Sequence, residues 1–465
     1  MKKLLIFIFL ITSILTYSQT TSEAENYFNN KEYLKAKSIF EKLLDRKPKD
    51  ALLNYKYARC CYELNENEES IKHFLLSGNR YSVKDWYLGE LYFKTYQFDE
   101  SLTALEAFLA TLAEDDKRIT EVNSQIDKAR IAQKLLKRVE SIAIIDSILL
   151  NKEDFLNAYR LSHDIGTLNH EPMTTVKNKL DSKITFTTQR ADRKVFSNYD
   201  LNNLDIFSSF KLLDDWSKPI SISAEINTKA NENYPFLLSD GVTLYFASDG
   251  VNSMGGYDIF LTKYSSASQK YLSPENVGFP FNSPANDYMM VIDENQKIGW
   301  FATDRNQISN KVMIYKYKYE DSKLYYRSEN ADSLRQVAQL KTFRKMTNNL
   351  QVAKSNTTNV QVQDSEKEFS VVINDSTVYT ELEQFKNPLA SAKITDWLNQ
   401  KKDIKLLIKE LNEARNRFLE EKKAEERKKI GDTILNSEKK LQELNISSQK
   451  LLTEACNLEI THNTK

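Results

Sequence analysis

The spacing of apolar residues changes twice along the chain. Before about residue 137 and again from Pro388, apolar side chains recur every three or four residues, as in amphipathic helices. Between Ile184 and Tyr317 apolar and polar residues alternate, which is typical of strands with one buried face. Six of the ten glycines lie in this middle region, between Gly241 and Gly299. The sequence therefore predicts a multidomain α + β protein with helical ends and a β-rich middle.

The helical first third contains an internal repeat, because one register aligns three successive segments of similar length. The equivalent positions hold small residues at Ala24, Ala58 and Gly89, and bulky residues at Phe40, Phe74 and Leu105. The equivalent positions are 34 and then 31 residues apart. Small residues at this spacing, together with Pro48 where a helix should end, resemble the tetratricopeptide repeat family. A generic bundle of helical hairpins is the alternative.

The resemblance implies an α-solenoid over residues 19–136, with a capping helix at 117–137. Repeats of this family carry no chemistry, and their concave groove binds a peptide or a partner domain. The candidate groove residues are Asn54, Tyr55, Tyr62, Lys84 and Tyr87. Because each solenoid unit contacts mainly its neighbours, we expect the helical repeats and the β-rich middle to have separate cores.

The β-rich middle also repeats itself. Its clearest unit runs from Tyr234 to Phe260, and the triplet Asp-Ile-Phe at 258–260 has an earlier copy at 205–207. The motif residues of the clearest unit are Asp240, Gly241, Gly255, Gly256, Asp258 and Phe260. Asp240-Gly241 predicts a tight turn, and we expect Gly256 to need a positive φ in the loop before the last strand. Each unit predicts about four strands and one linker.

The motif from Tyr234 to Phe260 resembles the PD40 family of WD40-like β-propeller repeats, found in TolB-type periplasmic proteins. The resemblance implies a propeller over residues 137–328. Three recognisable units do not close a ring. Two further β-like stretches, 141–161 and 367–386, are expected to supply divergent blades, and a separate small sheet is the alternative. Over residues 19 to about 320, the combination of these two repeat types resembles envelope proteins, in bacteria with a type IX secretion or gliding apparatus, that join tetratricopeptide repeats, a propeller and an OmpA-like domain. Nothing after residue 320 resembles that last domain, so peptidoglycan anchoring is not implied.

The N-terminus predicts secretion. Met1 to Lys3 is a short positive segment, Leu4 to Leu15 is apolar, and Thr16 and Ser18 are small residues before a cleavage site. We expect a signal peptide over residues 1–18, with an uncleaved membrane anchor as the alternative. No cysteine lies near the site, so lipoprotein attachment is not predicted. The expected location is the periplasm or the inner face of the outer membrane.

The last third is predicted to be helical after a linker. Residues 329–366 should form a helix from Asp332 to Lys345 and a polar, mobile segment, because the sequence from 346 to 366 has little apolar content. From 388 to 460 the pattern predicts a long helix or coiled coil. Its apolar seam includes Ile404, Leu407, Leu411, Ala414 and Phe418. A docked single helix, a helical hairpin and a dimer through this segment all remain open.

Charge and motif content argue against catalysis and against nucleic acid. The chain has 65 basic and 65 acidic residues, so it lacks the positive field that holds a phosphate backbone. No nucleophile elbow, phosphate loop or metal-ligand spacing occurs, and we expect no cofactor and no metal. Acids such as Asp240 and Asp258 could form a carboxylate cluster, but their recurrence from unit to unit indicates a structural role.

We therefore expect a non-catalytic adaptor that binds envelope proteins through the repeat groove and a propeller face. The alternative is a propeller enzyme or glycan-binding protein that acts on envelope polysaccharide. Catalysis on blade acids would require an acid and a base that converge on one point, whereas these acids recur at equivalent positions.

Overall fold

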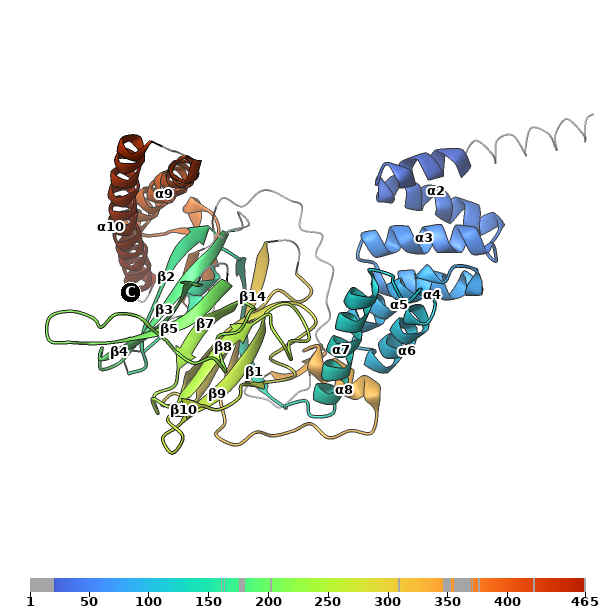
Figure 1. The fold of residues 1–465 in the computed structure, drawn as a ribbon, viewed down its shortest axis with the longest axis horizontal. Helices are drawn as coiled ribbons and strands as arrows, with labels where there is room; N and C mark the ends of the chain where they lie inside the picture. Colours follow the sequence, from blue (N-terminus) through green and yellow to red (C-terminus); the bar gives the residue numbers. More distant parts are fainter. Residues whose placement is uncertain are drawn as a thin grey trace, which may run out of the picture.

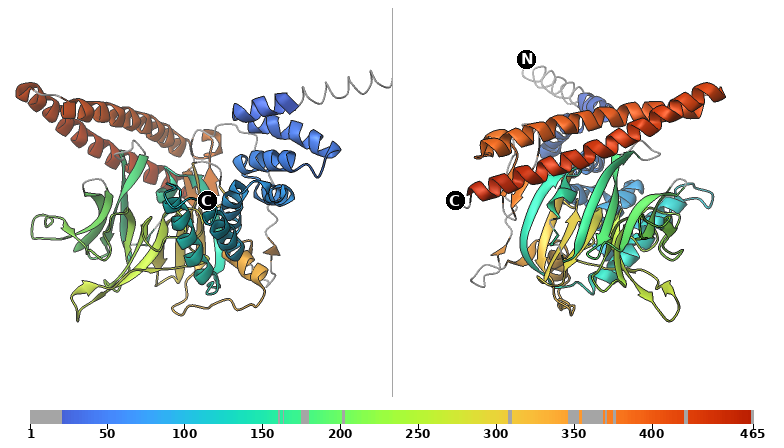
Figure 2. Two further views of the ribbon diagram at one scale, coloured as in Figure 1. Left: turned by 45° about the vertical axis from the view of Figure 1, so that its right-hand side comes forward. Right: turned by 90° about the vertical axis from the view of Figure 1, so that its left-hand side faces the viewer.

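The computed structural model contains an N-terminal helical region, a group of antiparallel sheets and two long C-terminal helices (Figures 1 and 2). The described residues are 21–159, 161–162, 164–174, 180–200, 203–307, 310–345, 353–354, 369, 371–374, 377–420 and 423–463. The predicted order of helical ends and a β-rich middle is confirmed. Within these residues no helix is both long and apolar enough to cross a bilayer. The predicted signal peptide lies outside them.

The N-terminal region is a row of antiparallel helices. A helix over residues 21–29 precedes α2 (Tyr33–Arg46), α3 (Ala51–Glu63), α4 (Asn67–Leu76), α5 (Val83–Lys94), α6 (Phe98–Leu109) and α7 (Ile119–Leu136). Equivalent side chains hold two successive pairs together. The Ser70 hydroxyl donates to the Ala58 carbonyl oxygen at 2.8 Å, and one repeat later the Ser101 hydroxyl donates to the Gly89 carbonyl oxygen at 2.7 Å. Small residues therefore stand where paired helices approach each other closely.

Three sheets, antiparallel except where β15 pairs with β1, form the middle of the molecule. The first contains, in order, β2 (Gly166–Thr174), β3 (Leu180–Thr188), β4 (Arg193–Asp200), β5 (Asn203–Phe210) and β6 (Ile220–Ser221). The second contains β7 (Glu232–Leu237), β8 (Thr243–Ser248), β9 (Asp258–Ser265), β10 (Lys270–Tyr271) and β11 (Glu275–Asn276). The third contains β12 (Asp287–Asp293), β13 (Ile298–Thr303), β14 (Lys311–Lys318), β1 (Ala143–Asn151), β15 (Thr342–Lys345) and β16 (Ala353–Lys354).

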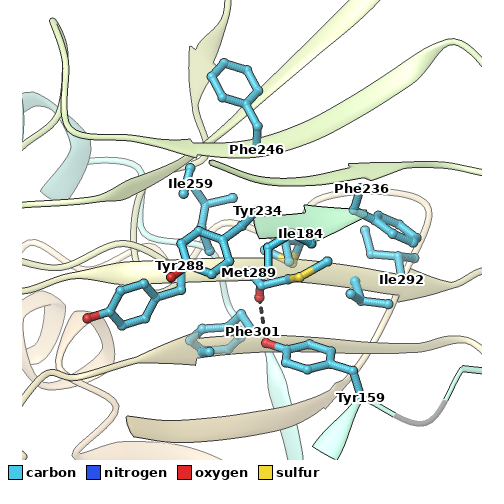
Figure 3. Close-up of a cluster of buried hydrophobic side chains, with 14 of the residues drawn as sticks. Tyr159, Ile184, Tyr234, Phe236, Phe246, Ile259, Tyr288, Met289, Ile292 and Phe301 are labelled. Carbon is cyan, nitrogen blue, oxygen red and sulfur yellow. Dashed lines mark hydrogen bonds between the residues drawn. The ribbon is translucent and has the colours of Figure 1, made fainter. Parts of the chain in front are cut away.

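The three sheets stack face to face around one core (Figure 3). Phe186 of the first sheet packs on Phe236 of the second with ring centroids 4.9 Å apart, and Tyr234 of the second packs on Tyr288 of the third at 5.5 Å. The Tyr159 hydroxyl donates to the Met289 carbonyl oxygen at 2.9 Å, which brings the segment after β1 into the same core. Among the described residues, strands β1 to β16 form a stack of three sheets and not a closed ring.

The two flanking β-like stretches do not form further blades. The first contains β1, which pairs with β14 and so extends the third sheet, and it continues into a 3₁₀ helix, η2 (Phe155–Ala158). The second forms a separate hairpin of β17 (Val371–Asn374) and β18 (Thr377–Tyr379). The expectation that 367–386 completes a propeller is therefore wrong, because its apolar side chains pack against the C-terminal helices instead. The alternative of a separate small sheet holds for this stretch.

The helix that follows β14 is shorter than predicted. Helix α8 spans Ala331–Ala338, and the backbone then turns at Leu340, whose φ is +57°, into strand β15. β15 pairs in parallel with β1, so residues 342–345 are strand and not helix. Most of the predicted polar linker lies outside the described residues.

The C-terminal third is a helical hairpin of α9 (Pro388–Glu420) and α10 (Ala424–Asn463), seen most clearly in Figure 2. The predicted seam residues Ile404, Leu407, Leu411 and Ala414 are buried. The base of the hairpin packs on β17 through Trp397, Ile394 and Val371. An ion pair between Lys401 Nζ and Asp154 Oδ1, at 2.6 Å, ties α9 to the segment after β1.

The sheets and the helical repeats have cores of their own, as expected, but they also share a buried cluster at their junction. Tyr96 and Phe98 pack on Phe279, from the linker between the second and third sheets, with centroids 5.5 and 5.9 Å apart. Met254 and Ala338 belong to the same cluster. The Lys128 ammonium donates to the Gly255 carbonyl oxygen at 2.9 Å across this junction. The last helices of the repeat region are therefore built into the sheet region.

Candidate protein-binding surface

The structure brings three of the five candidate groove residues together on α3 and α5. Tyr62 and Tyr87 meet edge to face with centroids 5.0 Å apart, and the Arg59 guanidinium lies 4.2 Å from the centroid of the Tyr87 ring. Tyr55, Arg59 and Tyr62 share a face of α3 because they follow one another at steps of four and three residues. We call Tyr55, Arg59, Tyr62 and Tyr87 the tyrosine surface. Each of these four residues is partly exposed, and the Tyr87 ring also stacks on the buried Phe74 with centroids 5.5 Å apart.

Charged groups border the tyrosine surface. The Tyr62 hydroxyl donates to the Glu90 carboxylate, and the Lys94 ammonium lies 5.0 Å from the Tyr62 ring centroid. Burial and the bond to Glu90 raise the pKa of Tyr62, and burial also raises the pKa of Tyr87. Both phenols are therefore neutral near pH 7 and can donate or accept hydrogen bonds. The surface combines partly exposed tyrosines, a guanidinium and a carboxylate; aromatic residues and arginine are enriched where proteins bind each other.

The other two candidates, Asn54 and Lys84, are buried and do not contribute to an exposed groove. The Asn54 amide nitrogen donates to the carbonyl oxygens of Pro48 and Asp50, at 2.9 Å each, and its oxygen lies 2.7 Å from His73 Nδ1. Asn54 thus satisfies backbone groups at the start of α3. Lys84 is buried at the start of α5, where its ammonium lies 3.4 Å from the Asp85 carboxylate.

Sequence reasoning missed Arg59, Glu90 and Lys94. The spacing in the sequence could have identified them, since Arg59 lies four residues from Tyr55 and three from Tyr62, while Glu90 lies three from Tyr87.

An open polar cleft lies between the repeat region and α8, and Lys94 belongs both to its lining and to the border of the tyrosine surface. The cleft is lined by Glu66, Asn67, Glu68, Glu69, Lys94, Thr95, Gln97, Asn306, Asp332, Arg335, Gln336, Gln339 and Lys341. Arg335 supports its wall through Glu100, at 3.2 Å, and the Tyr96 carbonyl oxygen, at 3.1 Å.

The recurring acids of the sheets hold neighbouring segments together. Asp304 accepts two hydrogen bonds from Asn286, from the backbone N–H at 2.8 Å and from the side-chain amide at 2.9 Å. In the preceding sheet, Asp249 accepts the same two bonds from Asn231 at the same distances. The two pairs are therefore one structural device used in successive sheets.

A second recurring device uses asparagine. Asn282 donates to the Ile259 carbonyl oxygen at 2.8 Å and accepts from the Ile259 N–H at 2.7 Å. Asn227, at the equivalent position after the first sheet, makes the same pair of bonds to Ile206, both at 2.8 Å. Each asparagine thereby ties the linker to the last long strand of a sheet. The two carbonyl oxygens also accept backbone bonds at 3.1 Å, from the Val277 N–H at Ile259 and from the Ile222 N–H at Ile206.

The predicted motif residues occupy structural positions. Asp240 accepts from the N–H groups of Val242 and Thr243, at 2.8 Å each, and Gly241 has the expected positive φ, +67°. Phe260 is buried and stacks on Phe246 with centroids 5.8 Å apart.

The expectation of a positive φ at Gly256 is wrong. Gly256 is needed for close approach, since a Cβ there would lie 2.0 Å from Asn286 Oδ1. A Cβ on Gly255 would lie 2.0 Å from the Ala285 carbonyl oxygen. Both glycines therefore allow the loop before β9 to reach the segment that precedes β12.

Asp258 and Asp287 are fully buried carboxyl groups near the junction with the repeat region. Asp258 accepts from Met254 N at 2.9 Å, Gly255 N at 3.1 Å and Asn276 Nδ2 at 2.7 Å. Burial and the neighbouring Asp287 raise the pKa of Asp258 to about 8. Burial also raises the pKa of Asp287, although Arg305 lies 2.9 Å from its carboxylate and opposes the shift.

These two carboxyls are fully buried and use their oxygens to hold loops, so their geometry favours a structural role. Among the described residues no group of three or more His, Cys, Asp and Glu side chains is arranged to hold a metal ion. The chain matches no protein-family model and no curated protein.

Proposed function

We propose that this chain is a non-catalytic scaffold of the bacterial envelope that binds other envelope proteins through the tyrosine surface. The observation that carries the proposal is the assembly of Tyr55, Tyr62 and Tyr87 around Arg59 on one side of α3 and α5. Tyrosine and arginine contribute disproportionately to protein–protein affinity, because they bury large areas and retain polar groups for orientation.

The recurring bonds support the finer assignment of both repeat types. Equivalent serine bonds in successive helix pairs favour tetratricopeptide-like repeats. Equivalent asparagine bonds in successive sheets favour the PD40 propeller type, here as an open stack of three. The proposed location, the periplasm or the inner face of the outer membrane, rests on the predicted signal peptide.

The roles of the acids favour a scaffold over an enzyme of envelope polysaccharide. Asp249 and Asp304 bind equivalent asparagines through their oxygens, and Asp240 binds the backbone of a turn. An acid–base pair would instead have to converge on a space that a substrate can enter. No observation favours a glycan or peptidoglycan as the ligand.

The proposal is tested by quantitative affinity capture from the native envelope. Chains carrying Tyr62→Ala with Tyr87→Ala should lose most of the partners that the natural chain captures. Tyr264→Ala is the matched control, because Tyr264 is a partly exposed tyrosine on β9, outside the repeat region. Thermal unfolding of both variants checks that the fold is retained. If the double variant captured the same partners in the same amounts as the natural chain, the tyrosine surface would not be the binding site.

A further inference from the structure

The loop between β5 and β6 exposes an unusual number of apolar side chains. Leu213 at its tip is 95% exposed and Leu212 is 55% exposed, while Phe210 and Ile220 at its two ends are about half exposed. The loop projects from the first sheet, away from the rest of the molecule (Figure 1). A soluble protein rarely presents adjacent leucines on a projecting tip without a use for them.

The loop is an ordered hairpin. The Ser217 N–H donates to the Phe210 carbonyl oxygen at 2.8 Å, and the Leu212 N–H donates to the Asp215 carbonyl oxygen at 2.7 Å, which closes the tip. Lys211 and Trp216 form a β-bridge between these bonds. The two leucines are therefore held in solvent by the backbone and are not exposed through fraying.

Cations and an aromatic ring surround the base of the hairpin. The Trp216 ring lies 4.5 Å from the Lys194 ammonium and 5.5 Å from that of Lys211. The Arg193 guanidinium lies 5.3 Å from the Phe210 ring. Lys183 lies near Lys194, since both ammonium groups approach the Phe196 ring, at 5.6 and 5.9 Å.

Two acids lie beside the tip. The Asp215 carboxylate accepts a hydrogen bond from the backbone N–H of Trp216 at 2.7 Å and lies close enough to Lys194 to interact with its charge. Asp214 is exposed. The hairpin thus combines an apolar end, an aromatic ring at mid-height and a positively charged base.

We propose that this hairpin inserts shallowly into the surface of an anionic phospholipid bilayer. Leu212 and Leu213 would enter the acyl boundary, Trp216 would lie at the headgroup level, where tryptophan is enriched, and the lysines would face anionic headgroups. Asp214 limits the depth, because its carboxylate must stay hydrated among the headgroups. A partner protein with an apolar pocket would leave the ring of cations unexplained, and it is treated as an outcome of the test.

This inference goes beyond the proposed scaffold function, since it depends on the hairpin alone. It would give the scaffold a peripheral attachment to the membrane. The tyrosine variants and the hairpin variants alter different regions, so failure of one proposal leaves the other standing.

The test is co-sedimentation of the purified full-length chain with vesicles of pure phosphatidylcholine, and with vesicles of roughly two parts phosphatidylcholine to one part phosphatidylglycerol. The chain should bind the anionic vesicles more strongly, and added salt should weaken this binding. Leu212→Ser with Leu213→Ser should lower the partition coefficient at least about tenfold. Lys194→Gln with Lys211→Gln should reduce binding to the anionic vesicles and narrow the difference from neutral vesicles, because Arg193 and Lys183 remain. Val251→Ser, at another highly exposed apolar residue, should leave binding unchanged.

A second readout locates the hairpin directly. Brominated phospholipids in the anionic vesicles should quench part of the tryptophan fluorescence, and Trp216→Phe should remove the quenched part. All variants carry the same N-terminus, so only differences between them count. Equal binding by the leucine variant and the natural chain would overturn the proposal, as would the absence of quenching at Trp216. Failure to bind vesicles, combined with loss of a detergent-extracted partner in the leucine variant, would also overturn it and assign the hairpin to a protein interface.

Discussion

The ring of Phe98, at the start of α6, stacks on the ring of Phe279 with centroids 5.9 Å apart and an interplanar angle of 25°. Phe98 belongs to the helical repeats and Phe279 to the linker between the second and third sheets, yet both are buried. A contact of this kind couples the stability of two regions that the sequence divides. The repeat region is therefore anchored to the sheets at its C-terminal end.

Phe279→Ala should destabilise both regions together. Removing a buried phenylalanine costs about 3–5 kcal/mol, and Phe98→Ala should have a similar effect. Because the two rings touch, the double variant should lose less than the sum of the single losses, by about 1 kcal/mol. Chemical denaturation followed by far-ultraviolet circular dichroism measures all three free energies of unfolding. Strict additivity would show that the rings do not interact, and two well-separated transitions in the natural chain would show that the regions unfold independently.

Asn282→Ala should be more damaging than Asn227→Ala, although the two asparagines make the same bonds. Asn282 is fully buried, so its loss leaves the Ile259 N–H without its acceptor and out of reach of water, at about 2 kcal/mol, while the Ile259 carbonyl oxygen keeps its bond from the Val277 N–H. Asn227 is partly exposed, so water can replace its bonds to Ile206 and the loss should be about 1 kcal/mol. If urea titrations gave the same loss in the free energy of unfolding for both variants, burial would not determine how much each asparagine stabilises the fold.

Gly256→Ala should destabilise the sheets, whereas Gly431→Ala should not destabilise the C-terminal hairpin. A Cβ at position 256 would collide with Asn286 Oδ1, which also accepts the Tyr257 N–H at 3.1 Å, so the Asn286–Asp304 pair must shift. We expect a loss of about 2 kcal/mol, in the range found when core contacts are overpacked. Gly431 lies within α10, where alanine is favoured over glycine by up to about 1 kcal/mol. Similar changes in melting temperature for both variants would contradict this placement.

Asp258 should make the folded state less stable as the pH rises. Burial and the neighbouring Asp287 raise its pKa from 3.8 to about 8, so the folded chain holds a proton that the unfolded chain releases across that interval. The folded state binds more protons there, and the free energy of unfolding must fall as the pH increases. Asp258→Asn removes this dependence, so the variant should gain stability relative to the natural chain between about pH 5 and pH 8.

Asp240→Asn is the control with the opposite sign. Burial opposes ionisation of Asp240, but the hydrogen bonds from Thr243 outweigh it and lower its pKa. The Asp240 variant should therefore be modestly destabilised at neutral pH, and the difference from the natural chain should disappear in acid. Parallel stability profiles for the two variants would refute the pKa assignment of Asp258.

The spacing of apolar and small residues along the chain predicted many of the helices and strands. Alternating apolar residues identified the strands around Tyr234 and Phe260, and small residues such as Ala58 and Gly89 identified the close helix crossings. Strand partners could not be predicted in the same way. β1 pairs with β14, which lies at the far end of the β-rich middle, and alternation shows that a strand exists without showing which edge it joins.

Other misses came from polar residues that serve the backbone. Asn54 has the spacing of a surface position, but its amide is occupied by carbonyl oxygens at the start of α3. Gly256 suggested a left-handed turn, whereas its absent Cβ makes room for Asn286, a residue from another segment. Arg59 was missed because its role depends on the ring of Tyr87, which only the packing of α3 on α5 brings close.

The most direct test of the account is the dissociation constant of one captured envelope partner for the natural chain and for the Arg59→Ala with Tyr87→Ala variant. Titration calorimetry with purified partner measures both, and Tyr264→Ala provides the matched control. We expect at least a tenfold weaker complex for the double variant, or about 1.4 kcal/mol, with the control unchanged. Dissociation constants within about twofold of each other, for folded proteins, would contradict the claim that the tyrosine surface is where this scaffold binds.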